Sequence, residues 1–195
     1  MTEKLREYSL LTDADLLSFE LDALEDLIEL EPKHYNAWSH RMFLANTFKL
    51  FETTSELEFT RKYIDKDLRN NSAWSYRRHA LSYRQNMYKE ELEKLCVDKI
   101  RLAPSNESAW VYATSFPGWQ TNQVFTSMCQ ALFADIQASG KPLSSYTDLA
   151  DTLVELLLFR NQTIEAAEIL NTLAESNHIR APIYKLRRDR LVIRK

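Results

Sequence analysis

The stretch "PKHYNAWSHR", residues 32–41, gathers the side chains best suited to chemistry in this chain of 195 residues. Lys33, His34, Tyr35 and Asn36 stand at a predicted turn that leads into a helix. The first turn of a helix presents unpaired backbone N–H groups and a partial positive charge, which together favour a phosphate. Lysine would add a point charge and tyrosine a neutral donor. The alternative is a solvated turn without a ligand.

Other arrangements typical of enzymes do not occur in the sequence. The chain has only two glycines, which cannot build a glycine-rich phosphate loop or a G-x-S-x-G elbow. Its four histidines form no H-x-x-x-H pair and none neighbours a cysteine in sequence: His34, His40, His79 and His178. We therefore expect no metal site within this chain. The residues alone favour a scaffold without an independent active site.

A block centred on tryptophan recurs every 36 residues, as "HYNAWSHR", "NNSAWSYR" and "NESAWVYA". Its three tryptophans are Trp38, Trp74 and Trp110. A recurring tryptophan one turn into a helix is most simply a wedge between stacked helical hairpins, and ligand stacking is the alternative. Arg41 and Arg77 follow three residues later, where we expect structural hydrogen bonds to nearby carbonyls or acids.

Amphipathic helical patterns fill the segments between the blocks. Leu17, Leu21, Leu24 and Ile28 share one helical face, and Leu92, Leu95, Cys96 and Ile100 repeat this before the third block. Pro32 and Pro104 help to end the preceding helices, and Asn or Ser before each tryptophan predicts a helix N-cap. The unit is helix, turn, helix. The predicted fold is an all-α, right-handed α-α superhelix of helical hairpins.

Beyond residue 120 the repeat decays, and four helical stretches predict a capping bundle over residues 120–195. The first should end at Gly140, and the second should turn Leu149, Leu153, Leu156 and Leu157 inward. Two further stretches, "TIEAAEILNTLAES" and "APIYKLRRDRLVIRK", complete it. No linker or low-complexity run divides the sequence, so we predict one domain over residues 1–195.

Charge is unevenly distributed along a chain whose net charge is −3. Residues 1–31 carry ten acids and two bases, net −8, whereas residues 180–195 carry seven bases and one acid, net +6. We interpret the basic tail as a solvated helix face and expect no nucleic-acid partner. No apolar run approaches a membrane span, and the N-terminus is too acidic for a signal peptide. Cys96 and Cys129, read as buried thiols, predict a cytoplasmic protein.

The repeated blocks carry a resemblance to a known family. Over residues 15–116, "HYNAWSHR", "DLRNNSAWSYRR" and "LAPSNESAW" resemble the N-x-x-x-W-x-x-R repeat of protein prenyltransferase alpha subunits. The sequences of the last two blocks are closer to the subunit shared by farnesyltransferase and type I geranylgeranyltransferase than to the alpha subunit of the Rab-specific enzyme. The segment "NHIRAPIYKLRRDRL" is also similar to that subunit's C-terminal helix.

The resemblance implies a crescent of hairpins wrapped around a catalytic beta subunit. In that family the beta subunit holds the zinc that activates the cysteine thiol of a CaaX protein, and alpha contributes polar side chains to the prenyl diphosphate. The implied partners are thus a beta subunit, a prenyl diphosphate and CaaX proteins. No cofactor is expected on this chain; zinc, with magnesium as a further candidate, would belong to the complex.

Only some of the family's site residues have a matching residue in this sequence. The family's Asn-Tyr-His aligns with His34, Tyr35 and Asn36, so tyrosine matches while its neighbours are exchanged. The family's lysine precedes an N-Y-x-x-W motif one repeat earlier than Lys33. Either Lys33 has taken over this role or N-terminal repeats are missing. We predict Lys33 and Tyr35 as catalytic residues and residues 33–36 as the diphosphate-binding set.

Two alternatives remain open at this point. The exchanged neighbours of Tyr35 also fit a non-catalytic scaffold of the same ancestry. The other alternative is the alpha subunit of the Rab-specific enzyme, which would require an escort protein.

Overall fold

The computed structural model describes residues 12–192, which fold into helices and turns without a β-strand. Contacts within the chain group it into two compact units, unit 1 up to Gln85 and unit 2 from Asn86. Each unit is described by itself. The prediction of one domain over residues 1–195 stays a prediction.

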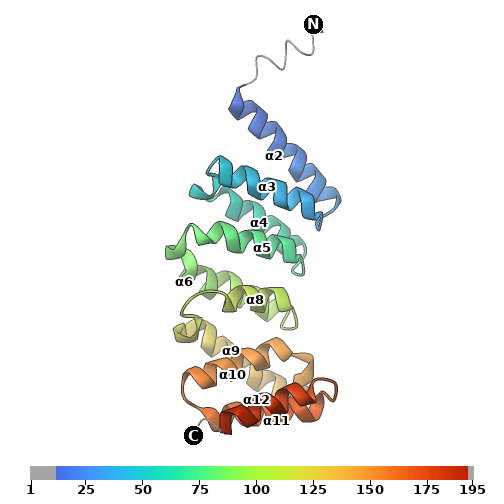
Figure 1. The fold of residues 1–195 in the computed structure, drawn as a ribbon, viewed down its shortest axis with the longest axis vertical. Coiled ribbons are helices and arrows are strands. Elements are labelled where there is room, and N and C mark those ends of the chain that lie inside the picture. Colours follow the sequence, from blue (N-terminus) through green and yellow to red (C-terminus); the bar gives the residue numbers. More distant parts are fainter. Residues whose placement is uncertain (1–11, 193–195) are drawn as a thin grey trace. The chain divides into compact units, whose positions relative to one another are not determined.

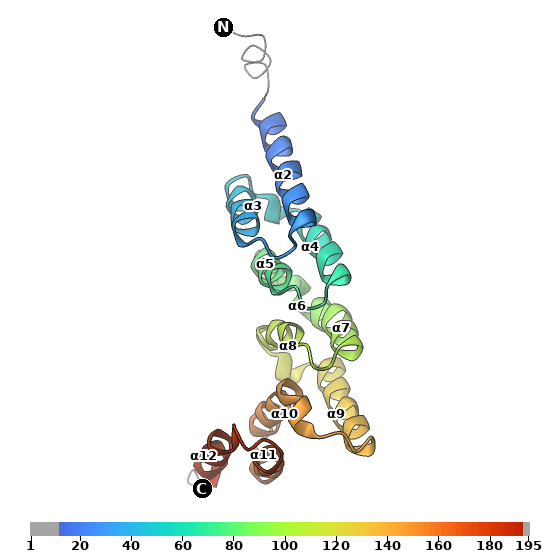
Figure 2. The ribbon, with the colours of Figure 1, turned by 90° about the vertical axis from the view of Figure 1, so that its right-hand side faces the viewer.

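Unit 1 consists of two helical hairpins. The first joins α2 (Asp13–Leu30) to α3 (Tyr35–Thr47), and the second joins α4 (Ser55–Lys66) to α5 (Asn71–Ser82). A short 3₁₀ turn, Leu50–Glu52, connects them. Within this unit α2 and α4 form one layer and α3 and α5 the other (Figures 1 and 2). The turns before α3 and before α5 consequently lie at the same edge of the unit.

Local sequence explains where these helices begin and end. Thr12 caps α2 through a capping box with Asp15, whose backbone N–H donates to the threonine hydroxyl over 3.2 Å. The helix ends at Leu30, two residues before Pro32, as the proline predicts. Its inner face buries Leu24 and Ile28, while Leu17 and Leu21 are half-buried. The predicted amphipathic helix is confirmed.

Unit 2 continues with helices that the sequence had indicated. They are α6 (Tyr88–Glu91), α7 (Val97–Leu102), α8 (Glu107–Thr114), α9 (Gln123–Ala138), α10 (Thr147–Phe159), α11 (Thr163–Ser176) and α12 (Ala181–Val192). A π-helical turn, Leu92–Cys96, joins α6 to α7, and it buries Leu92, Leu95 and Cys96. Further 3₁₀ turns are Gln85–Met87, Trp119–Thr121 and Leu143–Ser145.

Helices α9 to α12 occur where the sequence predicted four helical stretches, and their capping role stays a prediction. Gly140 follows α9 at a φ of +67°, a left-handed conformation that glycine adopts without strain. On α10, Leu149, Leu153 and Leu156 are buried as expected, and Leu157 is half-buried. The predicted end of the last helix reaches residues 193–195, which lie outside the described residues.

The predicted all-α class built from helical hairpins is therefore confirmed. Among residues 12–192, none of the helices has both the length and the apolar character that crossing a bilayer would demand.

Candidate functional site: the tryptophan repeat and a polar turn

The three repeat tryptophans occupy equivalent structural positions. Trp38, Trp74 and Trp110 are buried, with at most 4% of their surface exposed. Each indole Nε1–H donates to the backbone carbonyl six residues earlier, over 2.9, 2.9 and 2.8 Å. This bond ties the first turn of each helix to the loop that precedes it, so the indole both fills the core and fixes the turn.

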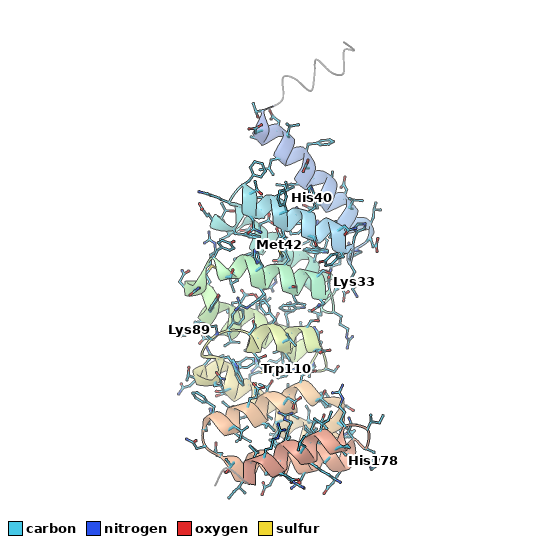
Figure 3. The ribbon with its side chains drawn as sticks, viewed as in Figure 1. Lys33, His40, Met42, Lys89, Trp110 and His178 are labelled. Atoms are coloured by element: carbon cyan, nitrogen blue, oxygen red, sulfur yellow. The ribbon has the colours of Figure 1, made fainter. Side chains whose placement is uncertain are left out.

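Trp38 and Trp110 also meet aromatic rings of the following elements. Trp38 on α3 lies 5.5–5.6 Å, centroid to centroid, from Phe59 and Tyr63 on α4 and Tyr76 on α5. Trp110 on α8 lies 6.2 Å from Phe125 on α9. The interpretation as wedges between hairpins fits these contacts, and burial leaves no exposed ring face for ligand stacking. Figure 3 shows Trp110 on α8.

Arg41 belongs to a buried polar cluster. Its Nε and Nη2 donate to the two carboxylate oxygens of Glu56 over 2.9 and 2.8 Å, a bidentate pair. Its guanidinium carbon lies 3.5 Å from the Phe59 ring centroid. The Tyr76 hydroxyl donates to the same carboxylate over 2.5 Å. The predicted structural role of Arg41 fits this arrangement.

Burial and charge set the ionisation of this cluster. Burial raises the pKa of the Tyr76 phenol, and the neighbouring Glu56 carboxylate raises it further. Burial acts to lower the pKa of Arg41, but the hydrogen bonds and charge of Glu56 outweigh it, and the pKa is raised. Around neutral pH Arg41 is thus a charged guanidinium and Tyr76 a neutral phenol.

The second repeat arginine reaches the backbone of the preceding helix. Arg77 Nη1 donates to the Leu57 carbonyl over 2.5 Å and contacts the Thr60 hydroxyl at 3.2 Å. In unit 2 the Tyr112 hydroxyl donates to buried Glu91 over 2.6 Å, as Tyr76 does to Glu56 in unit 1. Sequence reasoning missed both glutamates. Their spacing of 35 residues, close to the tryptophan repeat, was the available signal.

At the polar turn, the structure gives His34 a capping role. His34 is the N-cap of α3, and its Nδ1 accepts the Ala37 backbone N–H over 3.1 Å. Asn70 caps α5 in the same way, since its Oδ1 accepts from the Ala73 N–H over 3.2 Å. The expectation that Asn or Ser caps every block is wrong for the first one. The cap position lies four residues before tryptophan, and Asn36 lies inside the helix.

Two turns at the edge of unit 1 are joined by side chains. Lys33 Nζ lies 3.4 Å from the Asp67 carboxylate, and Asn70 Nδ2 donates to the Pro32 carbonyl over 2.9 Å. Figure 3 shows Lys33 at the turn before α3. Asp67, which the sequence did not indicate, supplies a negative charge that a bound anion would have to displace from Lys33.

Exposed donor groups nevertheless lie in sequence at the start of α3. Tyr35, the first residue of that helix, is 77% exposed, and Lys33 and Asn36 are also exposed. The backbone N–H groups of Tyr35 and Asn36 head a helix of 13 residues and have no partner within it. An ammonium, a phenol and helix-terminal N–H groups form a donor set suited to phosphate oxygens.

Comparison with known proteins follows the same repeat. Residues 17–48 and 53–84 match the protein prenyltransferase alpha subunit repeat. A chain of Candida albicans protein geranylgeranyltransferase-I complexed with GGPP superposes with a TM-score of 0.74 at 28% identity, covering 89% of this chain and 59% of that one. Residues 17–84 of this chain thus contain two protein prenyltransferase alpha subunit repeats.

Curated relatives match part of this chain within longer chains. The geranylgeranyl transferase type-2 subunit alpha of Rattus norvegicus is 33% identical over 111 residues, which are 57% of this chain and 19% of that protein. The Homo sapiens counterpart is 33% identical over 99 residues, 51% of this chain and 17% of that protein. The chain thus matches about a fifth of the length of these relatives.

The matched prenyltransferase repeats coincide with structural units. Residues 17–48 cover most of the α2–α3 hairpin, and residues 53–84 cover the α4–α5 hairpin. The polar turn therefore lies inside the first matched repeat, and Asp67 inside the second. The third tryptophan block lies beyond both matched ranges, yet its indole makes the same bond to a preceding carbonyl, that of Pro104.

Proposed function

We propose that this chain is the alpha subunit of a heterodimeric protein prenyltransferase. It would support a catalytic beta subunit and contact the prenyl diphosphate through residues 33–36. The observation that carries the proposal is the donor set of Lys33, Tyr35 and the α3 N-terminus, placed within a prenyltransferase alpha-subunit repeat. The structural neighbour, which was solved with GGPP, supports a prenyl diphosphate as the ligand.

In the proposed reaction, the substrate thiolate attacks C1 of the prenyl group. The S–C bond forms as the C–O bond to the diphosphate breaks, and diphosphate departs. Negative charge grows on the departing oxygens, so donors that meet it there lower the barrier. Lys33 would contribute its ammonium charge and Tyr35 its hydroxyl. His34, whose Nδ1 is engaged in the cap, retains only Nε2 for a ligand.

Zinc in such a complex would activate the thiol, and we assign it to the beta subunit. Among residues 12–192, no three His, Cys, Asp or Glu side chains gather in a way that could hold a metal ion. Magnesium is a further candidate for the complex. Cys96 and Cys129 are buried and form no disulfide within residues 12–192, which supports the proposed cytoplasmic location, because thiols stay reduced in reducing compartments.

For the protein substrate we favour CaaX proteins, with farnesyl or geranylgeranyl as the transferred group. The structural neighbour, a type I geranylgeranyltransferase, supports this choice. The second candidate is the Rab-specific type 2 enzyme, which the rat and human relatives favour. A non-catalytic scaffold is favoured by the Asp67 carboxylate beside Lys33.

Co-expression with beta subunits of the three enzyme classes tests the proposal. We expect a stable complex that transfers a prenyl group to a CaaX peptide. Within it, Lys33→Ala and Tyr35→Phe should each lower kcat about tenfold to hundredfold, because each removes one donor from the departing diphosphate. The controls are Lys141→Ala and Tyr83→Phe, which remove an exposed ammonium and an exposed phenol elsewhere.

The outcomes separate the candidates. Transfer only to a Rab protein with its escort would select the type 2 enzyme. A complex that neither binds prenyl diphosphate nor transfers the prenyl group would leave the non-catalytic scaffold as the remaining candidate. Equal kinetics for Lys33→Ala and Lys141→Ala would remove Lys33 from the diphosphate site.

A further inference from the structure

Helix α2 has a second apolar face besides the one that packs inside unit 1. Leu17, Leu21, Leu24 and Ile28 point toward the core. At 100° per residue, another set falls on a single stripe about 130° away from them. Its members are exposed: Leu16, Phe19, Ala23, Leu27 and Leu30. Phe19 is 68% exposed and Leu30 is 85% exposed, and a contiguous apolar stripe of this kind marks an interaction surface.

Acidic side chains border this stripe on both sides. On the helical wheel Asp22 and Asp26 flank one side, and Asp13 and Glu20 flank the other. Glu20 lies 3.1 Å from His40, whereas Asp13, Asp22 and Asp26 have no side-chain partner within residues 12–192. In all, α2 has seven acids and no base. The occupant of the stripe should therefore be apolar along its middle and basic at its margins.

A hollow extends the stripe toward α3. Its volume is about 320 Å³, and it lies between the N-terminal half of α2 and the C-terminal end of α3. Leu16, Leu17, Leu44 and Phe48 form its apolar wall, with Asp13 and Glu20 at the rim. Such a hollow accepts a large apolar side chain, as in other sites where an amphipathic helix lies in a groove. Figure 3 places His40 on α3 where that helix faces α2.

Helix α12 in unit 2 has the complementary pattern. Ile183 and Leu186 are 59% and 53% exposed, and with Arg190 they follow the i, i+3, i+7 spacing of one helix face. The helix has four bases and one acid, net +3. Arg187 and Arg188 contact Asp151 and Asn171 of unit 2, but Lys185 and Arg190 are exposed and have no partner in the described part of the chain.

We infer that the α2 stripe of one molecule binds the α12 helix of a second copy. The lengths match, since α12 spans about 18 Å and the stripe from Leu16 to Leu30 about 21 Å. Charge favours this pairing over α2 with α2 or α12 with α12, which would oppose like charges. The contact is heterologous, so it forms open chains of molecules unless their rotation closes a ring. It is independent of the proposed function.

The test uses the full-length chain and charge reversal on each surface. Sedimentation equilibrium at about 50 mM NaCl should show association that rises with concentration, and about 500 mM NaCl should weaken it at least tenfold. The double variants Asp22→Lys/Asp26→Lys and Lys185→Glu/Arg190→Glu should each be monomeric. Mixed together, they should associate again as pairs, because the native α12 of the first variant can bind the native α2 of the second.

A matched control separates this pairing from net charge. Glu107→Lys/Asp135→Lys makes the same charge change on exposed residues of α8 and α9, and it should associate like the native chain. Circular dichroism checks that every variant is helical. Phe19→Cys mixed with Ile183→Cys should yield a cross-linked dimer with a short bis-maleimide. A native chain that stays monomeric, a mixture that stays monomeric, or a control that also dissociates would overturn the inference.

Discussion

Glu56 is a buried residue of unit 1 on which several polar contacts converge. It is 2% exposed and accepts from Arg41 twice and from Tyr76 once. A buried carboxylate is costly to desolvate, and full hydrogen bonding offsets that cost. The cluster joins α3, α4 and α5, so one side chain specifies how the α4–α5 hairpin stacks on α3.

Replacing this carboxylate should destabilise the chain strongly. Glu56→Gln leaves the Arg41 guanidinium buried without its counter-charge, and we expect a loss of about 3–5 kcal/mol in the free energy of unfolding. Urea denaturation followed by tryptophan fluorescence measures it. Glu58→Gln, an exposed neighbour on α4, should change stability by less than about 0.5 kcal/mol. Similar losses for the two variants would contradict the assigned role of Glu56.

At the scale of the element, the repeat helices α3 and α5 each start with two fixed bonds. A cap residue four positions before tryptophan accepts a backbone N–H in the first and second blocks, and the indole donates to a carbonyl two residues before the cap. The two bonds fix both the start of the helix and the entering chain. At the first block this rigid start also presents Lys33 and Tyr35.

The cap on α3 should accept asparagine in place of histidine. His34→Asn introduces the residue type that caps α5 at Asn70, so this variant should match or exceed native stability. His34→Ala should lower the free energy of unfolding by about 1 kcal/mol, because the Ala37 N–H loses its acceptor. Thermal unfolding at pH 7.5 compares the three proteins. If alanine and asparagine are equally stable, the histidine is not acting as a cap.

The sequence predicted elements better than it predicted contacts. The 36-residue spacing located α3, α5 and α8, because tryptophan and the cap recur with the backbone geometry that requires them. It misplaced the first cap, because histidine is an unusual cap residue and Asn36 stood nearby. It could not show Asp67 beside Lys33, since that pair forms only when two hairpins stack. Glu56 was hidden for the same reason, as one of three acids on α4.

Ion pairs between α2 and α4 make the stability of the folded state depend on pH. Hydrogen bonds from Lys62 and Lys66, both at 2.6 Å, hold the pKa of Glu29 at about 2. A carboxyl whose pKa is lowered on folding stabilises the folded state at every pH above the pKa that it has in the unfolded chain. That contribution disappears as the pH falls from about 4.5 to about 2.

We therefore expect Glu29→Gln to lower the melting temperature at pH 7 but not at pH 2. The gap between native and variant proteins should close steadily between pH 4.5 and 2, as followed by circular dichroism. Glu31→Gln, at an exposed residue one position beyond α2, provides the control and should show no such closing gap. A gap for Glu29→Gln that persists at pH 2 would rule out this linkage.

For the whole molecule, the repeat design implies that stability is distributed locally. The Arg41–Glu56–Tyr76 cluster belongs to unit 1, and the Tyr112–Glu91 bond to unit 2. In arrays of this type stability is close to a sum of repeat and nearest-neighbour contributions, and local opening stays below the global unfolding energy. A change in one cluster should therefore affect the helices around it first.

Peptide-resolved hydrogen exchange measures this directly. Arg41→Ala should speed amide exchange in α3, α4 and α5 at least tenfold, while α10 and α11 keep their native protection, because the lost bonds lie in unit 1. Tyr112→Phe should give the reverse pattern, with faster exchange in α8 and little change in α3. A uniform increase across all helices in either variant would mean that the chain opens only by global unfolding. The 195 residues would then unfold as a single cooperative unit, which would contradict the distributed stability inferred here.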